Sequence, residues 1–298
     1  MKLKRKFLKN IEEWSLEKPL SIVGATGSGK TSTLLSFLRS TSLRPLLLSL
    51  DSVAAYKELD IGSSKPLGSD LSDFAWQGLS FVSPTEAMNA TRMRDEVLPF
   101  INQAIAKNDP MVFVGGTHFY ERFILEGPAP GKASSPEFLA ELAKTGVVAV
   151  YEKLLQQDKR WSNHLHVNDE YRVFRYADLV LRQGLCYEEL KAGSESPLFP
   201  EVECLILNSE KESLEPKLKK RIAEMFALGW IEETRNILTK YGAKAPALQS
   251  VGYAEIVEFL TNKPSEQDFT QLQEAIFIRH RQLAKQQRTW LRKLAHQV

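Results

Sequence analysis

The sequence has few cysteines and no long apolar run, and each of these absences excludes a class of protein. Its two cysteines, Cys186 and Cys204, show neither the spacing of a metal site nor the number that a disulfide framework needs. We therefore expect two free thiols in a reducing compartment. No apolar run approaches the roughly 20 residues of a membrane span. The absences together favour a cytoplasmic protein without membrane contact.

The sequence also has almost no net charge, which is +2, so no global field requires a nucleic-acid partner. Five of the first ten residues are Lys or Arg, but no apolar stretch of about 7–15 residues follows them. A signal peptide is therefore not expected. We expect this basic arm to be a solvated, partly helical tail, with a contact to RNA as the alternative.

What the chain does contain is enough apolar material for a sizeable core. Its 298 residues are 43% hydrophobic, which suits one large domain or a core domain with a smaller lobe.

A glycine-rich stretch near the start fits the phosphate-binding pattern of Gly, four residues, then Gly-Lys-Thr. The apolar run 20–23 predicts a buried strand before it, and the pattern of 31–39 predicts a helix after it. Glycines let the loop N–H groups approach an anion, Lys30 adds a positive charge, and the Thr31 hydroxyl can bind Mg²⁺. The predicted phosphate ligands are Gly24, Ala25, Thr26, Gly27, Ser28, Gly29, Lys30 and Thr31.

Two further apolar runs, 45–50 and 111–114, predict buried strands that end on polar or glycine residues. Asp51 follows the first strand, and Gly115, Gly116 and Thr117 follow the second. Ligands of parallel sheets bind beyond the carboxyl ends of strands, so Asp51 is expected near the bound phosphate. The alternatives are that Asp51 caps the next segment and that the glycines only permit a tight turn.

The remaining pattern predicts a helix from Ser83 to Ala106, then helices only between 135 and 190, then a strand at 202–207. Helices are expected at 138–143, 147–157, 169–185, 217–228, 231–240, from Gly252-Tyr253 onward, and at 266–295. Pro and Gly at 126–131 and 193–200 mark boundaries. We therefore expect an α/β fold: a parallel phosphate-loop sheet flanked by helices. Its domains are a core of 1–131 and 193–298 and an all-helical insertion of 132–192.

Two basic surfaces are candidate contacts for nucleic acid. Arg172 and Arg175 share a helix face beside Tyr171. The last helix carries a basic stripe, Arg281, Lys285, Arg288 and Arg292, and an expected apolar stripe, Ile276, Leu283, Trp290 and Leu294. Arginines beside aromatic residues suit RNA, but solvated helix faces are the simpler alternative.

Several motifs in one order give the chain a resemblance to the tRNA dimethylallyltransferases, also called tRNA isopentenyltransferases. It extends from about residue 22 to about residue 292. The motifs are the phosphate loop; Asp51-Ser52; Tyr56, Asp60-Ile61-Gly62 and Lys65-Pro66; Gly115-Gly116-Thr117 with Tyr120; Asn168-Asp169, Arg172 and Arg175; Val251-Gly252-Tyr253; and Arg281-Gln282, Ala284-Lys285, Gln287 and Thr289-Trp290.

This resemblance implies transfer of the dimethylallyl group of dimethylallyl diphosphate to the exocyclic amine of an adenosine beside the tRNA anticodon. It implies catalytic roles for Lys30, Asp51 and Thr117, with Mg²⁺ at Thr31. The helical insertion is then expected to grip the anticodon stem-loop, in a protein that acts as a monomer. The implied tRNA contacts are Asp51, Ser52, Val53, Ala54, Thr117, Tyr171, Arg172, Arg175, Gln249, Gly252, Tyr253, Arg281 and Lys285.

The chain departs from the family pattern mainly where RNA contacts are expected. Trp76-Gln77-Gly78-Leu79 lacks the family's histidines, and Gln249, Leu139 and Lys217 stand where arginine is usual. A small-molecule phosphate-loop kinase is the first alternative function, although no arginine-bearing lid is evident. Prenylation of free adenine nucleotides and a non-catalytic RNA-binding module are the others.

Overall fold

The computed structural model describes residues 3–128, 130–192, 197–207, 211–262 and 266–295. The chain divides into two compact units, which are described separately: Leu3–Leu125 with Phe199–Val298, and Glu126–Leu198. We call them the sheet unit and the helical unit. The division falls about six residues outside the boundaries of 132 and 192 expected from composition.

The sheet unit is built on six parallel strands in the order β1-β6-β2-β5-β3-β4. The strands are β1 Lys4–Leu8, β2 Leu20–Gly24, β3 Leu46–Ser49, β4 Ala75–Gln77, β5 Met111–Gly115 and β6 Glu201–Leu207. All five residues of β2 are buried, because helices cover both faces of a parallel sheet. The predicted strands β2, β3, β5 and β6 are confirmed, whereas the short edge strand β4 was not predicted.

The basic N-terminal arm is a strand, so the prediction of a partly helical, solvated tail is wrong. β1 pairs in parallel with β6 at the edge of the sheet. Arg5 forms an ion pair with the buried Glu121 at 2.6 Å, and Lys6 pairs with the buried Glu203 at 2.8 Å. Two buried carboxylates require cationic partners, and this requirement holds the arm in the sheet.

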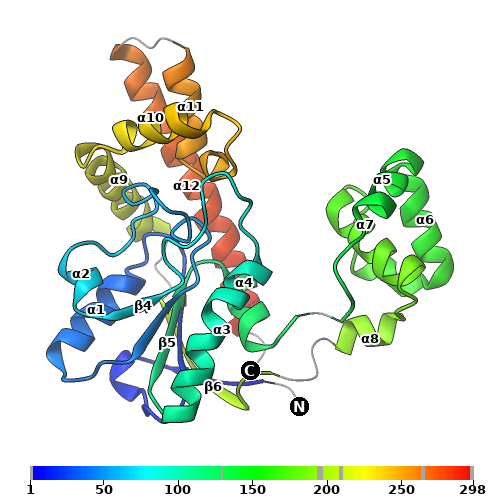
Figure 1. Cartoon of the computed structure of the whole chain (residues 1–298), viewed down its shortest axis with the longest axis horizontal. Coiled ribbons are helices and arrows are strands. Elements are labelled where there is room, and N and C mark those ends of the chain that lie inside the picture. The colour runs from blue at the N-terminus through cyan, green and yellow to red at the C-terminus, as the bar shows by residue number, and fades with distance from the viewer. Residues whose placement is uncertain (1–2, 129, 193–196, 208–210, 263–265, 296–298) are drawn as a thin grey trace. The chain divides into compact units, whose positions relative to one another are not determined.

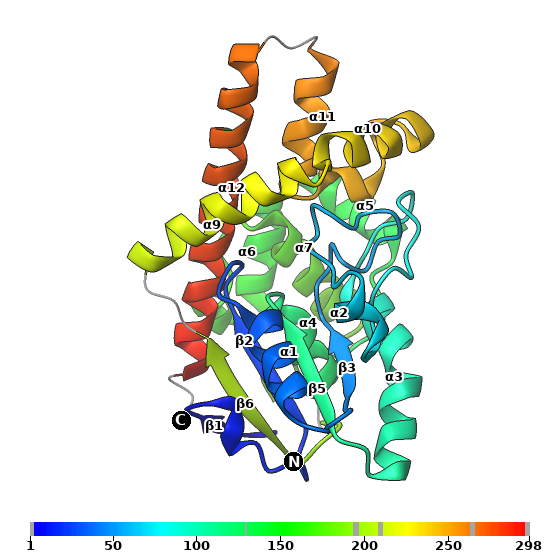
Figure 2. The ribbon, with the colours of Figure 1, turned by 90° about the vertical axis from the view of Figure 1, so that its left-hand side faces the viewer.

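Helices cover both faces of the sheet, and Figure 1 shows α1 on the side opposite α3 and α4. α1, Lys30–Ser40, packs Leu34, Leu35 and Leu38 against the face that includes Ile22 and Leu205. α12, Glu266–Ala295, packs Leu291 against Val23 and Cys204 on the other face. The phosphate loop lies between β2 and α1. Figure 2 shows the ribbon after a turn of 90° about the vertical axis of Figure 1.

The other helices of the sheet unit are α2 Ser69–Ser72, α3 Ala90–Lys107, α4 His118–Leu125, α9 Lys211–Ala227, α10 Trp230–Tyr241 and α11 Tyr253–Thr261. The predicted start of α3 at Ser83 is wrong. The helix begins after Asn89, whose side chain accepts the N–H of Arg92. The N–H of Met88 is donated to the Tyr56 hydroxyl, which holds the preceding segment outside the helix.

As predicted, the described residues of the helical unit form helices and no strand. They are α5 Pro136–Thr145, α6 Val147–Gln157, α7 Glu170–Ala177 and α8 Tyr187–Ala192, with a short 3-10 helix at Lys159–Asn163. Its core centres on Val150, Leu154, Trp161 and Val173. The single helix expected over 169–185 instead changes to a π-helical turn at Asp178–Arg182. None of the described helices in either unit is long and apolar enough to cross a membrane.

Candidate active site

The phosphate loop has a conformation that requires its glycines. Gly27 and Gly29 have φ of 76° and 86°, the left-handed region, and Gly29 stands at the N-terminal cap of α1. A Cβ on Gly24 would lie 2.4 Å from the Ser28 Oγ and 2.7 Å from the Leu207 carbonyl oxygen. The predicted strand, glycine loop and helix are therefore all present, with the first-turn N–H groups of α1 at the loop.

Lys30 extends back along this loop. Its Nζ donates to the carbonyl oxygens of Gly24 at 3.0 Å and Ala25 at 2.9 Å. Burial lowers the pKa of Lys30 to about 8, with the Asp51 carboxylate opposing this effect and Arg221 adding to it. A cation that has lost part of its hydration interacts strongly with an anion that enters the loop.

Asp51 caps the segment that follows it, which was one of the two roles considered from the sequence. Its Oδ1 accepts the N–H groups of Val53 at 2.8 Å and Ala54 at 3.2 Å. The same residue also lines a cavity of about 90 Å³ together with Thr26, Lys30, Thr31 and Gly116. Capping and cavity lining are therefore compatible, and the cavity joins the phosphate loop to the end of β3. Ala54 belongs to the same lining, and Ser52 and Val53 are half-buried beside it.

Arg221 on α9 is a cavity residue that the sequence analysis missed. Its Nε is buried and has no hydrogen-bond partner among the described residues. Burial lowers its pKa, and the Asp51 carboxylate partly opposes this. Lys217 stands where the family usually has arginine, and Arg221 lies one helical turn further along. It adds a cation to the lining of the cavity, which also contains Lys30.

Gln287 from α12 joins the two loops of the cavity. Its Oε1 accepts the N–H of Thr26 at 2.7 Å, and its Nε2 donates to the carbonyl oxygen of Gly116 at 3.0 Å. A Cβ on Gly116 would lie 2.6 Å from that Nε2. Gly116 therefore permits close approach of α12, and the glycine pair does more than permit a turn. Thr117 follows, half-buried, at the start of α4.

The segment 60–66 forms another wall of the cavity through Ser63, Ser64, Lys65 and Pro66. Lys65 is buried, and its Nζ donates to the Asp60 carboxylate and the Tyr56 carbonyl oxygen. Burial lowers its pKa, and Asp60 opposes this effect. Lys65 thus braces its own loop.

One carboxylate, that of Glu233 on α10, holds this segment from outside the cavity. It accepts the N–H groups of Asp60 at 2.8 Å, Ile61 at 2.7 Å and Gly62 at 3.2 Å. The Tyr253 hydroxyl donates to the same carboxylate at 2.7 Å.

Tyr253 and Gly252 lie in the core, which corrects their predicted contact with tRNA. Tyr253 has no exposed surface. A Cβ on Gly252 would lie 2.1 Å from the Trp230 ring, and one on Gly62 would lie 1.9 Å from the same ring. The Val-Gly-Tyr and Asp-Ile-Gly motifs therefore pack against one tryptophan, and their role is to position the cavity wall.

A metal cluster of three or more His, Cys, Asp or Glu side chains is not found among the described residues. The Thr31 hydroxyl and the Asp51 carboxylate do line one cavity. The Thr31 hydroxyl fits Mg²⁺ of the kind that takes most of its ligands from phosphate oxygens and water.

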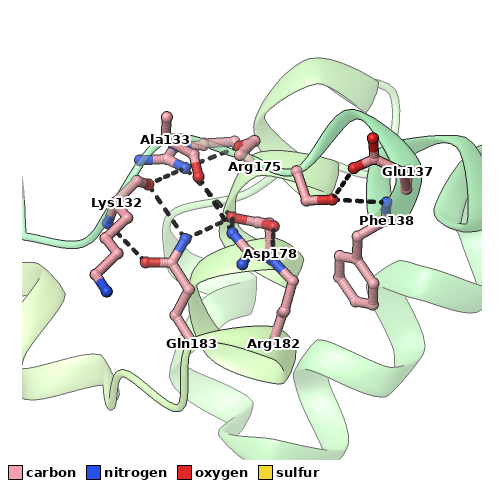
Figure 3. A network of polar contacts seen from close by, with 10 residues as sticks. Lys132, Ala133, Glu137, Phe138, Arg175, Asp178, Arg182 and Gln183 are labelled. Carbon is pink, nitrogen blue, oxygen red and sulfur yellow. Dashed lines mark hydrogen bonds and ion pairs between the residues drawn. The ribbon is translucent and has the colours of Figure 1, made fainter.

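In the helical unit, the two predicted RNA-binding arginines differ in exposure. Asp178 is fully buried and accepts hydrogen bonds from Arg175, Arg182 and Gln183 (Figure 3). Arg175 also donates to the Lys132 carbonyl oxygen and the Ser134 hydroxyl, which ties the entry segment to α7. The Arg175 side chain is only 28% exposed.

By contrast, the Arg172 side chain is 57% exposed and pairs with Asp169 at 3.4 Å. Tyr171 beside it is 81% exposed. Tyr171 and Arg172 therefore form the accessible part of the predicted RNA surface in this unit, and Arg175 supports it from beneath.

The predicted contacts near the C-terminus lie in the sheet unit. Arg281 and Lys285 are exposed on α12, and the exposed Gln249 donates to the Ala243 carbonyl oxygen. The predicted apolar stripe of α12 is partly wrong, because Trp290 is 44% exposed whereas Leu291 is buried.

The comparisons with known proteins agree with this geometry. The model of the IPP transferase family matches residues 54–294, and that of the isopentenyl transferase family matches residues 19–77. The chain belongs to the IPP transferase family.

Family relatives cover nearly the whole chain. A tRNA dimethylallyltransferase of Helicobacter hepaticus is 32% identical over 92% of the chain and 91% of its own length. Another, of Rippkaea orientalis, is 30% identical over 93% of the chain and 91% of its own length.

Two solved structures share the fold at 22% sequence identity. A tRNA isopentenylpyrophosphate transferase of Bacillus halodurans has a TM-score of 0.65 and covers 93% of the chain and 87% of its own. A eukaryotic dimethylallyltransferase acting on tRNA has a TM-score of 0.78, and the match covers 92% of the chain and 70% of the eukaryotic protein. The phosphate-loop α/β fold expected from the sequence is confirmed.

Proposed function

We propose that this enzyme transfers the dimethylallyl group of dimethylallyl diphosphate to the exocyclic amine of the adenosine on the 3′ side of the anticodon in tRNA. The observation that carries the proposal is that one cavity contains both the cations of the phosphate site and the Asp51 carboxylate. An allylic transfer needs these two features together: a site for a leaving diphosphate and an acceptor for the proton that the amine loses.

In the proposed reaction the amine nitrogen forms a bond to the allylic carbon while the bond from that carbon to the diphosphate oxygen breaks. Lys30, Arg221 and the N–H groups of the loop stabilise the charge that develops on the departing pyrophosphate. The Thr31 hydroxyl would hold Mg²⁺, which would supply additional neutralisation of the diphosphate. Asp51 accepts the amine proton, and Thr117 orients the base or the carboxylate by hydrogen bonding.

The RNA must present an extruded base, because an adenosine stacked in a loop cannot reach a cavity of this kind. Tyr171 and Arg172 of the helical unit and Arg281 and Lys285 of α12 are the proposed contacts for the anticodon stem-loop. Their exposure suits phosphate and base contacts. We place the activity in the cytoplasm and assign it to the monomer.

The test is mass analysis of tRNA nucleosides after incubation of unmodified tRNA with the protein, Mg²⁺ and dimethylallyl diphosphate. We expect one adenosine per substrate tRNA to gain the dimethylallyl group, and none when the diphosphate is omitted. A parallel incubation offers ATP with the same tRNA. ATP turnover without prenylation would support the alternative, a small-molecule kinase, and would overturn the proposal.

A further inference from the structure

Three aromatic residues expose more than a third of their surface in the part of the chain that the structure describes: Phe119, Tyr171 and Trp290. Tyr171 belongs to the proposed RNA surface. Trp290 has the Lys293 ammonium 5.7 Å from its ring centroid. Phe119, 60% exposed, has no role in the site as described so far. An exposed phenyl ring has no polar group to offer to water, so a ring held at the surface suits a flat apolar ligand.

The Phe119 ring is supported from its own helix. It is the second residue of α4, two residues after Thr117. Its centroid lies 6.0 Å from that of Phe123 at an interplanar angle of 44°, and 6.2 Å from that of Tyr120 at 57°. These two rings support part of the Phe119 side chain and leave most of it exposed.

Phe119 also lies close to the cavity along the chain, because it follows the lining residue Gly116 by three residues. Its neighbour Tyr120 is 8% exposed. Burial raises the pKa of Tyr120 to about 12, and Tyr56 and the Asp51 carboxylate raise it further. The short segment from Gly116 to Phe119 therefore leads from the lining of the cavity to an exposed ring.

We propose that Phe119 is a stacking platform for the nucleobase that neighbours the target adenosine in the RNA. This inference rests on the proposed function. Extrusion of one base leaves the adjacent base without a stacking partner on that side. A flat aromatic ring outside the cavity replaces the lost partner, and such stacking tolerates any base because every base has a π-face. Phe119 is thus a positioning residue for a loop from which one base is extruded, and it does not touch the reacting atoms.

The test is a double-mutant cycle between Phe119 and the RNA. The probes are an anticodon stem-loop with all its bases and two versions in which the 5′ or the 3′ neighbour of the target adenosine is abasic. Phe119→Leu keeps an apolar side chain but removes the flat ring, and Phe119→Trp keeps a flat ring. Leu228→Ala is the matched control, because Leu228 is 65% exposed in the same unit.

For the intact stem-loop we expect Phe119→Leu to raise the Kd about 5- to 100-fold, whereas Phe119→Trp and Leu228→Ala leave it nearly unchanged. For one of the abasic probes, Phe119→Leu should have no further effect, because the base that stacks is already absent. The Kd for dimethylallyl diphosphate should be the same in all variants.

Equal effects of Phe119→Leu on all three probes would overturn the stacking assignment, as would an unchanged Kd for the intact stem-loop. The wild-type protein is first tested for prenylation of the same stem-loop. Failure of that reaction counts against the proposed function, and failure of the cycle after a successful reaction counts against Phe119 alone.

Discussion

Asp51 combines two roles that one substitution can separate. Its carboxylate caps the turn after β3 by accepting the N–H groups of Val53 and Ala54, and it is the proposed proton acceptor. Asp51→Asn keeps an oxygen for the cap but removes the basic group. We expect Asp51→Asn to keep the thermal midpoint and diphosphate affinity while single-turnover prenylation slows by about 10²–10⁴-fold.

Asp51→Ala serves as the comparison, because it loses the cap as well. It should show the same loss of rate together with a loss of stability of about 1 kcal/mol, measured by urea unfolding. A normal single-turnover rate in Asp51→Asn would remove Asp51 from the chemistry and leave it as a cap.

Lys30 sets an alkaline limit on diphosphate binding. Burial lowers its pKa to about 8, below its ordinary value near 10.5, so the free protein loses this cation as the pH rises through 8. The affinity for dimethylallyl diphosphate should be nearly constant from pH 6.5 to 7.5 and should fall by up to about tenfold per pH unit above 8. Calorimetry across this range measures it.

Lys30→Arg is the control for this pH dependence, because its guanidinium does not titrate in this range. The variant should bind the diphosphate with a flatter pH profile. A wild-type profile that stays flat to pH 10 would show that Lys30 is not the cation that holds the diphosphate.

His118 makes the fold sensitive to acid. Both ring nitrogens are buried and have no hydrogen-bond partner within the described residues. Burial lowers its pKa to about 4, with Lys30 and Arg5 lowering it further, whereas an unfolded chain has a histidine pKa near 6.5. Its neutral form therefore stabilises the protein above pH 6.5, and this contribution is lost as the pH falls toward 4.

His118→Gln should reduce the loss of unfolding free energy between pH 6.5 and pH 4.5. The quantity compared is the pH slope from urea unfolding, because the substitution also changes stability at neutral pH. Identical slopes in the two proteins would indicate that other groups determine the acid response.

At the scale of elements, the local sequence pattern was sufficient to predict a helix or strand where the segment buries one regular face. The strands β2, β3, β5 and β6 and the helix α6 follow from apolar runs and helical spacing. The local sequence pattern predicted the wrong secondary structure where a residue far along the chain determines the conformation of the segment. β1 is a strand because Glu121 and Glu203 require its cations, and α3 starts late because Tyr56 takes the N–H of Met88.

The site shows the same division. The glycine loop and Asp51 were predicted because their chemistry lies in adjacent residues and strand ends. Arg221 was missed, and Gln287 was noted only as a motif residue without a role, because helices α9 and α12 bring them to the cavity from far along the chain. Trp290 was expected in the apolar stripe because it lies fourteen residues after Ile276; a seven-residue repeat drifts off one face of a straight helix.

The carboxylate of Glu233 is predicted to position the cavity wall at 60–66. Three N–H groups and the Tyr253 hydroxyl converge on it. Glu233→Gln replaces one acceptor oxygen by an NH₂ group that faces donors, so we expect the loop to loosen and the KM to rise more than kcat falls. Glu232→Gln, next to it on α10 and paired with Arg235 at 3.0 Å, should change neither constant.

Glu233→Asp adds a rescue test, because the shorter carboxylate keeps the charge and both acceptor oxygens. Its KM should lie between those of the wild type and Glu233→Gln. If Glu233→Gln lost stability but kept the wild-type KM, the carboxylate would stabilise the fold without positioning the wall.

At the scale of the whole molecule, the cavity is built entirely from residues of the sheet unit, and the helical unit has a core of its own. Replacing residues 132–192 by a short Gly-Ser linker should therefore leave diphosphate binding within about threefold of the wild type, because no cavity residue is removed. The Kd for the anticodon stem-loop should rise at least about tenfold, since the surface of Tyr171 and Arg172 is lost. The double variant Tyr171→Ala with Arg172→Ala in the full chain tests the same surface without deletion, and it should weaken RNA binding in the same direction. Stem-loop binding that survives both changes would place RNA recognition on α12 and the sheet unit alone.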